Sequence, residues 1–105
     1  EQAVTGFTAF LKRFPDSGYR SASLFWLGNA QYATSAFREA IASYQRLLTT
    51  APEHVRVPEA RLAIANCQME LKDAKSAKRT LEDVFKLHPQ SEAAATAKDR
   101  LSRLR

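Results

Sequence analysis

The chain has 105 residues, a net charge of +5, 45% hydrophobic and 26% charged residues, as expected for one globular domain. Its three glycines, four prolines and single cysteine argue against a turn-rich β fold, an internal disulfide framework and a multi-cysteine zinc module. No apolar run approaches the roughly 18 residues that a membrane span requires, so we expect no direct membrane insertion.

Apolar residues recur at steps of three and four along the chain, which predicts amphipathic helices. We expect six of them, in chain order at residues 2–14, 18–34, 36–49, 57–71, 73–87 and 91–104. Ser17 and Ser91 are candidate N-caps of the second and the last helix. Pro58 fits the first turn of the fourth helix, where its missing N–H is not needed.

Three prolines, Pro15, Pro52 and Pro89, lie 37 residues apart and indicate an internal repeat. Other residues share this spacing, namely Ala3, Ala40 and Ala77, Phe7, Tyr44 and Leu81, Asn29 and Asn66, and Gln31 and Gln68. Short helices bury their apolar stripes only when antiparallel pairs stack on their neighbours. The sequence therefore predicts a single all-α domain, a helical solenoid. It comprises a second half-repeat at 1–15, full repeats at about 16–52 and 53–89, and a terminal helix at 90–105.

The repeat resembles the tetratricopeptide repeat, whose pattern is W-x2-L-G-x2-Y…A-x3-F…P. The central repeat has the sequence Leu24-x2-Leu27-Gly28-x2-Gln31…Ala40-x3-Tyr44…Pro52. It departs from the pattern at two aromatic residues, since Tyr32 comes one place late and Trp26 two places late. The turn after its first helix is Ser35-Ala36, where the family usually has Gly-Asp. The resemblance implies antiparallel helix pairs that bind other proteins.

Three segments are similar to one bacterial envelope subgroup, the C-terminal tetratricopeptide domains of Tol-Pal system periplasmic proteins, the cell division coordinators. The segments are Phe14-Pro15-Asp16-Ser17, Leu24-Phe25-Trp26-Leu27-Gly28 and His88-Pro89-Gln90-Ser91. The resemblance implies a non-enzymatic adaptor in the periplasm of a Gram-negative bacterium. It also implies partners, a TolA-like inner-membrane protein and the peptidoglycan-synthesis machinery, and a homo-oligomer formed through an N-terminal coiled coil outside this chain. Three alternatives stay open: an outer-membrane assembly lipoprotein, a regulatory repeat domain of a larger enzyme, and a structural spacer.

The sequence contains no catalytic or cofactor motif, such as a phosphate loop or a dinucleotide fingerprint. We therefore expect no enzymatic activity and no cofactor. His54 and His88 lie in turns without a second ligand at metal spacing, so we expect no metal, and Cys67 is predicted to be a buried, inert thiol. Basic residues are in excess only in the last third of the chain, whereas the aromatic residues lie mainly in the first half. This separation disfavours nucleic-acid binding.

The first helix of each pair is expected to line a concave groove that binds a partner segment. The predicted groove residues are Phe25, Asn29, Tyr32, Leu62, Asn66 and Met69, with Thr96, Asp99 and Arg103 beyond them. The two asparagines either pair with a partner's backbone or satisfy local polar groups. Apolar residues precede each asparagine by one turn, which favours a hydrophobic or helical partner segment over a bare carboxylate. We interpret Trp26 as part of the core between helices.

The expected first helix matches only the second half of a repeat. Phe7 and Phe10 then lack the cover that a preceding helix provides elsewhere in the chain. An exposed apolar patch of this kind commonly marks an interface. We therefore expect a neighbouring chain to cover these two side chains.

Overall fold

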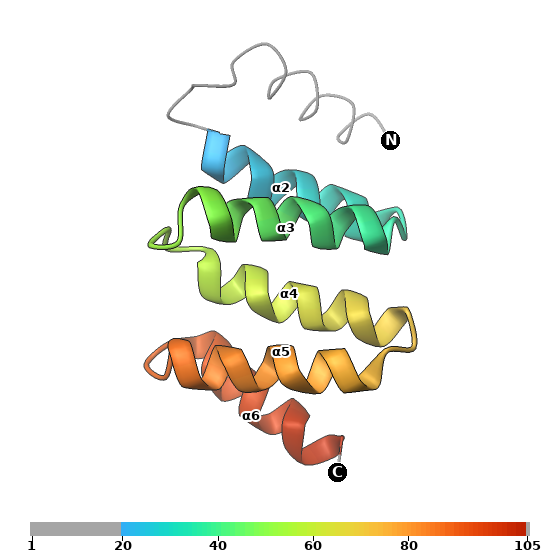
Figure 1. The fold of residues 1–105 in the computed structure, drawn as a ribbon, viewed down its shortest axis with the longest axis vertical. Helices are drawn as coiled ribbons and strands as arrows, with labels where there is room; N and C mark the ends of the chain where they lie inside the picture. The colour runs from blue at the N-terminus through green and yellow to red at the C-terminus, as the bar shows by residue number, and fades with distance from the viewer. Residues whose placement is uncertain (1–19, 105) are drawn as a thin grey trace.

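The computed structural model of the chain describes residues 20–104 (Figure 1). Its helices are α2 (Arg20–Ala33), α3 (Phe37–Thr50), α4 (Val57–Glu70), α5 (Ala74–Leu87) and α6 (Glu92–Arg103). These described residues contain no strand, and the predicted all-α fold is confirmed. Each helix begins and ends within two residues of its expected bounds. The helix expected at 2–14, with Phe7, Phe10 and the cap Ser17, lies outside the described residues.

The helices stack in chain order, and each packs on the one that follows it (Figure 1). In addition, α4 contacts α6, the next helix but one. Figure 1 shows the chain reversing direction at each turn, so that neighbouring helices run antiparallel. The arrangement is the expected helical solenoid, in which each helix contacts mainly its neighbours.

Local hydrogen bonds fix where two of the helices begin. The Ser91 hydroxyl accepts the N–H of Ala94 at 3.0 Å, which confirms this residue as the N-cap of α6. The carboxylate of Asp73 accepts the N–H of Ser76 at 3.2 Å at the start of α5. Hydrogen bonds with Ser76 also hold the pKa of the Asp73 carboxyl below its ordinary value. Pro58 lies in the first turn of α4, as expected.

The turns after α2 and α4 close the helices without glycine. Ser35 and Lys72, which lie 37 residues apart, adopt the left-handed conformation, with φ of 63° and 65°. The Ala36 N–H donates to the carbonyl of Gln31 at 2.8 Å, and the Ser35 N–H donates to the carbonyl of Tyr32 at 3.0 Å. These two bonds form a Schellman motif, which usually has glycine at the left-handed position. The predicted Ser35-Ala36 turn is therefore present, although it contains no glycine.

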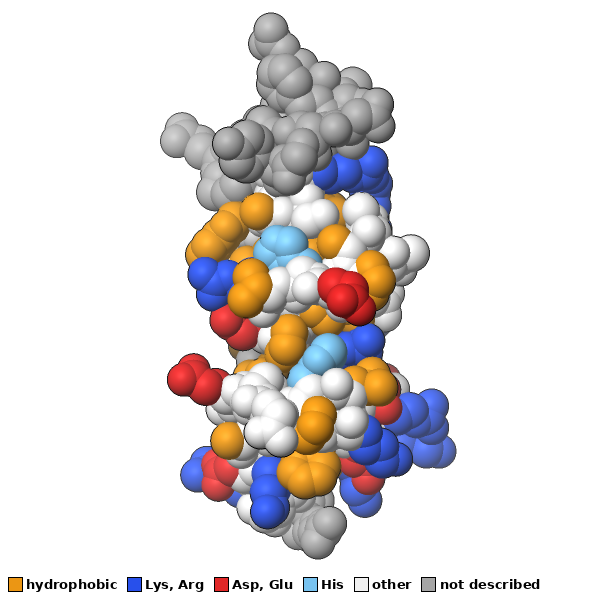
Figure 2. Space-filling model, turned by 90° about the vertical axis from the view of Figure 1, so that its left-hand side faces the viewer, with side chains coloured by type: hydrophobic (Ala, Val, Ile, Leu, Met, Phe, Trp, Pro, Cys, Tyr) orange, Lys and Arg blue, Asp and Glu red, His pale blue; other side chains and the backbone are white. Residues whose placement is uncertain are grey.

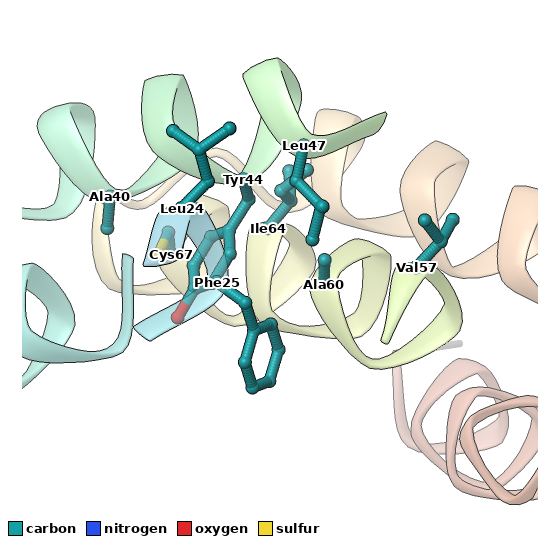
Figure 3. Packing of buried hydrophobic residues seen from close by; sticks show 9 residues of the cluster. All are labelled: Leu24, Phe25, Ala40, Tyr44, Leu47, Val57, Ala60, Ile64 and Cys67. Atoms are coloured by element: carbon teal, nitrogen blue, oxygen red, sulfur yellow. The ribbon is translucent and has the colours of Figure 1, made fainter. Parts of the chain in front are cut away.

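Buried side chains form two clusters, one on each side of α4. The first joins α2, α3 and α4 (Figure 3) and contains Leu24, Phe25, Ala40, Tyr44, Leu47, Val57, Ala60, Ile64 and Cys67. The second joins α4, α5 and α6 and contains Ala65, Leu81, Val84, Ala93, Ala94 and Ala97. Cys67 is fully buried, as predicted, and burial raises the pKa of its thiol to about 11. The thiol therefore stays protonated and poorly nucleophilic at neutral pH.

The glutamines that share the 37-residue spacing tie the two helices of each pair together. The Ser43 hydroxyl donates to Oε1 of Gln31 at 2.6 Å, which joins α3 to α2. The Thr80 hydroxyl donates to Oε1 of Gln68 at 2.7 Å, which joins α5 to α4. The two hydroxyl residues are themselves 37 positions apart. The repeat therefore conserves a hydrogen bond between paired helices as well as their apolar contacts.

Stability is expected to decrease below neutral pH because of His88. Its Nε2 accepts a hydrogen bond from Nε of Arg61 at 3.1 Å, and partial burial together with the Arg61 charge lowers the pKa of the imidazole. The unfolded chain, where the pKa is about 6.5, then binds more protons than the folded chain. We expect the free energy of unfolding to fall as the pH is lowered through about 6.5 in urea titrations. His88→Gln should reduce this slope, and an unchanged slope would rule out His88 as its source.

Candidate functional site

Two adjoining hollows lie along α2, α4 and α6, and we call them together the inner groove. The first, of about 250 Å³, is lined by Phe25, Trp26, Asn29, Arg56, Glu59, Leu62, Ala63 and Asn66. The second, of about 150 Å³, is lined by Ala65, Asn66, Met69, Leu81, Arg100, Arg103 and Leu104. They share Asn66 on α4, so the middle of the groove lies at this residue.

Most of the residues that the sequence predicted for the groove line these hollows. Phe25, Asn29, Leu62, Asn66 and Met69 all do so, together with Arg103. Tyr32 lines neither hollow, since its ring packs edge-on against Phe37 at 5.4 Å between centroids. Thr96 and Asp99 are also absent from the lining, although Asp99 forms an ion pair with Arg103 at 3.3 Å.

Two neighbouring aromatic residues on α2 have different environments. Phe25 is only 4% exposed and packs near Tyr44, so it contributes mostly to the core. Trp26 is 45% exposed, and its interpretation as core is wrong. The two rings meet edge to face, with 5.1 Å between their centroids, but only Phe25 belongs to the first cluster. The exposed aromatic surface of the groove is therefore that of Trp26.

A charged residue that sequence patterns did not indicate packs on both rings. The Arg56 guanidinium lies 5.5 Å from the ring centroid of Phe25 and 5.7 Å from that of Trp26, within the range of cation–π attraction. Nη1 of the same side chain lies 2.9 Å from Oε1 of Glu59. The backbone N–H of Arg56 donates to Nδ1 of His54 at 3.0 Å, which helps to fix the turn before α4. Because Arg56 lies in a turn, helical periodicity gives no signal for it.

Both groove asparagines hydrogen-bond to groups of the chain itself. Oδ1 of Asn29 accepts the hydroxyl of Tyr44 at 2.6 Å, and Oδ1 of Asn66 accepts Nη1 of Arg100. In the hydrogen bonds described for these two amides within residues 20–104, the amide oxygen is the acceptor. An amide group carries two further N–H donors. Each asparagine therefore satisfies a local group and still offers donors to a bound segment.

The groove combines apolar surface with cationic groups. Met69 is 40% exposed, and it lies with Leu62 and Trp26 among the apolar lining residues. Arg100 and Arg103 lie at the α6 end, and Arg56 lies at the α2 end, paired with Glu59. Apolar patches with a few placed polar groups are suited to binding a segment of another molecule.

Two further properties bear on the kinds of ligand expected from the sequence. Across residues 20–104, no three His, Cys, Asp or Glu side chains are grouped so that they could hold a metal ion. In the same part of the chain, each helix is too short or too polar to cross a membrane.

Comparison with protein families gives one match that covers most of the chain. A family model described as tetratricopeptide repeat matches residues 31–101. The matched segment begins near the end of α2 and extends through α6. A search of the curated proteins finds no match.

Proposed function

Because the chain belongs to the tetratricopeptide repeat family, we propose that it is a non-enzymatic adaptor whose inner groove binds a segment of a partner protein. Repeats of this family generally mediate protein–protein interactions. We further propose that the adaptor acts in the periplasm, in the Tol-Pal envelope and cell-division system. The motifs around Pro15, Trp26 and Pro89 support this second part through their similarity to that subgroup.

The exposure of Trp26 is the observation that carries the groove assignment. Contiguous exposed apolar surface with a polar rim commonly marks an interaction site, and Trp26, which is 45% exposed, lines the groove beside Leu62 and Ala63. Binding energy at protein interfaces is concentrated in a few residues, among which tryptophan, tyrosine and arginine are enriched. The groove contains Trp26, Arg56 and Arg100 within one lined surface. These three side chains are therefore the expected anchors.

The chemistry of the lining suggests what kind of segment fits. Leu62 and Met69 offer apolar contact along α4, and the Asn66 amide between them offers N–H donors. Arg100 and Arg103 favour an acidic residue at the α6 end. A segment with apolar side chains and a carboxylate at one end satisfies all of these groups. In the Tol-Pal assignment, a TolA-like inner-membrane protein or the peptidoglycan-synthesis machinery supplies it.

Replacing a groove anchor is expected to weaken partner binding. Trp26→Ala should reduce the affinity for a periplasmic TolA fragment by tenfold or more, or about 1.4 kcal/mol. The fold should survive because Trp26 is 45% exposed, which circular dichroism checks. Leu87→Ala is the matched control, since it removes an apolar side chain that is 57% exposed but lies outside the groove.

Two outcomes would contradict the proposal. If Trp26→Ala and Met69→Ala keep full affinity while Arg46→Ala or Lys78→Ala abolishes it, the binding surface is not the inner groove. If the unmodified chain does not bind the fragment at all, the Tol-Pal assignment is wrong. Tyr32→Ala is an internal comparison, because Tyr32 lies outside both hollows and should affect binding less than Trp26.

A further inference from the structure

A third hollow is lined by residues of α5 and α6. These two helices form the C-terminal end of the stack (Figure 1). It has a volume of about 350 Å³ and is lined by Glu82, Phe85, Lys86, Lys98, Leu101 and Ser102. None of these residues lines the inner groove. Phe85 is 42% exposed, and Nζ of Lys98 lies 5.9 Å from the centroid of its ring. We call this surface the α5–α6 face.

The 37-residue repeat shows what the α5–α6 face corresponds to. Lys98, Leu101 and Ser102 on α6 are the equivalents of Arg61, Ile64 and Ala65 on α4. In the earlier position, Ala65 is 1% exposed and clusters with side chains of α5, whereas Ile64, which is 4% exposed, belongs to the first cluster with α2 and α3.

On α6 the position equivalent to Ala65 is open, since Ser102 is exposed, while Leu101 is partly buried against the second cluster. Ala65 clusters with Leu81 and Val84 of α5, which shows what kind of side chain occupies this seat in the earlier repeat. Among residues 20–104, no helix packs on α6 as α5 packs on α4. The α5–α6 face therefore repeats a helix-binding seat that is open in the described part of the chain.

The same comparison gives the direction of a helix on this seat. Arg61 donates from Nε to His88, the residue that caps the C-terminal end of α5. Lys98 occupies the equivalent position on α6. A helix that lies on α6 as α5 lies on α4 would therefore place its C-terminal end near Lys98. A cation at a helix C-terminus is favourable because it faces the negative end of the helix dipole.

We propose that the α5–α6 face binds an amphipathic helix of a partner protein, with apolar side chains at i, i+4 and i+7 and acidic residues on its flanks. The apolar spacing is that of the buried α5 residues Ala77, Leu81 and Val84, of which Leu81 and Val84 cluster with Ala65 of α4. The acidic flanks follow from Lys86 and Lys98, which border the hollow beside a single acidic residue, Glu82. This surface is separate from the inner groove, and the proposal does not depend on the function proposed for that groove.

Charge favours an acidic partner over a second copy of this chain. The whole chain carries a net charge of +5, and α5 itself carries Lys75, Lys78, Arg79 and Lys86 against Glu82 and Asp83. Figure 2 shows basic side chains, in blue, with fewer acidic ones, in red, around apolar ones at the lower end of the visible face. A second basic helix on this end would bring like charges together, which costs free energy. An acidic helix instead gains attraction at both flanks.

Two synthetic peptides test the proposal on the 105-residue chain. Both are capped, fluorescently labelled helices with Ala, Leu and Val at the spacing of Ala77, Leu81 and Val84. One carries glutamates on its flanks and the other lysines. In anisotropy titrations, the glutamate peptide should bind at least tenfold more tightly than the lysine peptide. Phe85→Glu should lower the affinity for the glutamate peptide at least tenfold. Leu87→Glu, on the same helix but outside the hollow, should leave this affinity unchanged.

Lys98→Glu gives a test that does not rest on the loss of an apolar contact. Lys98→Glu should reverse which of the two peptides binds more tightly. Because Lys98 is exposed, the helical circular dichroism of the chain should not change. Equal binding of both peptides, or full binding by Phe85→Glu, would overturn the proposal. A dimer in sedimentation that Phe85→Glu dissociates would also overturn it, because the occupant would then be a second copy. Trp26→Ala should leave peptide binding unchanged, which separates this result from a failure of the groove assignment.

Discussion

Leu81→Ala is expected to lower the free energy of unfolding by about 2–5 kcal/mol. Leu81 is 1% exposed and packs in the second cluster with Ala65 and Val84, between α4 and α5. Truncation removes buried apolar surface and leaves a cavity beside alanine, which is too small to fill it. Urea unfolding followed by circular dichroism measures the loss.

Leu87→Ala supplies the control for this measurement. It is the same chemical change on the same helix, at a side chain that is 57% exposed. Surface substitutions of this kind usually change stability by no more than about 0.5 kcal/mol. Equal losses for the two variants would contradict the position of Leu81 in the core.

Gly28→Ala is expected to destabilise the fold, by about 2 kcal/mol, although alanine is the better helix former. A Cβ on Gly28 would lie 2.5 Å from Cε1 of the Tyr44 ring. That ring is 1% exposed, and its hydroxyl is held by Asn29 at 2.6 Å, so it cannot easily move away. Overpacking costs about 1–3 kcal/mol, and so close a contact belongs at the upper end. The gain in helix propensity is only about 1 kcal/mol.

The second repeat indicates how this loss can be repaired. The equivalents of Gly28 and Tyr44 are Ala65 and Leu81. In the second repeat, a residue larger than glycine therefore faces a residue smaller than tyrosine. The double variant Gly28→Ala/Tyr44→Leu should therefore be more stable than the sum of the two single changes, by about 1 kcal/mol or more. Strictly additive losses in the four-variant cycle would show that Cβ and ring do not collide.

Most of the fold could be predicted because its signals are local or periodic. Helical spacing and the 37-residue phase of the prolines placed the described helices within two residues of their bounds. The cap at Ser91 and the position of Pro58 depend only on residues in the same turn. The turn at Ser35 carried no glycine signal, and its left-handed conformation is visible only in the structure.

The groove was harder to predict because its details depend on residues distant in the sequence. Which of Phe25 and Trp26 is exposed depends on packing against α3 and on Arg56, about one repeat away. The bond from Arg100 to Asn66 crosses 34 residues, and no periodic pattern indicates it. Sequence spacing could therefore select the helices that line the groove, but not the contacts within it.

Trp26 allows the groove assignment to be tested by the protein's own fluorescence. It is the single tryptophan of the chain, it is 45% exposed, and it lines the inner groove. During a titration with a tryptophan-free TolA fragment, binding in the groove should shift its emission to shorter wavelength, with the same midpoint as the calorimetric binding curve. A complex that forms by calorimetry while the Trp26 emission stays unchanged would contradict binding in the inner groove.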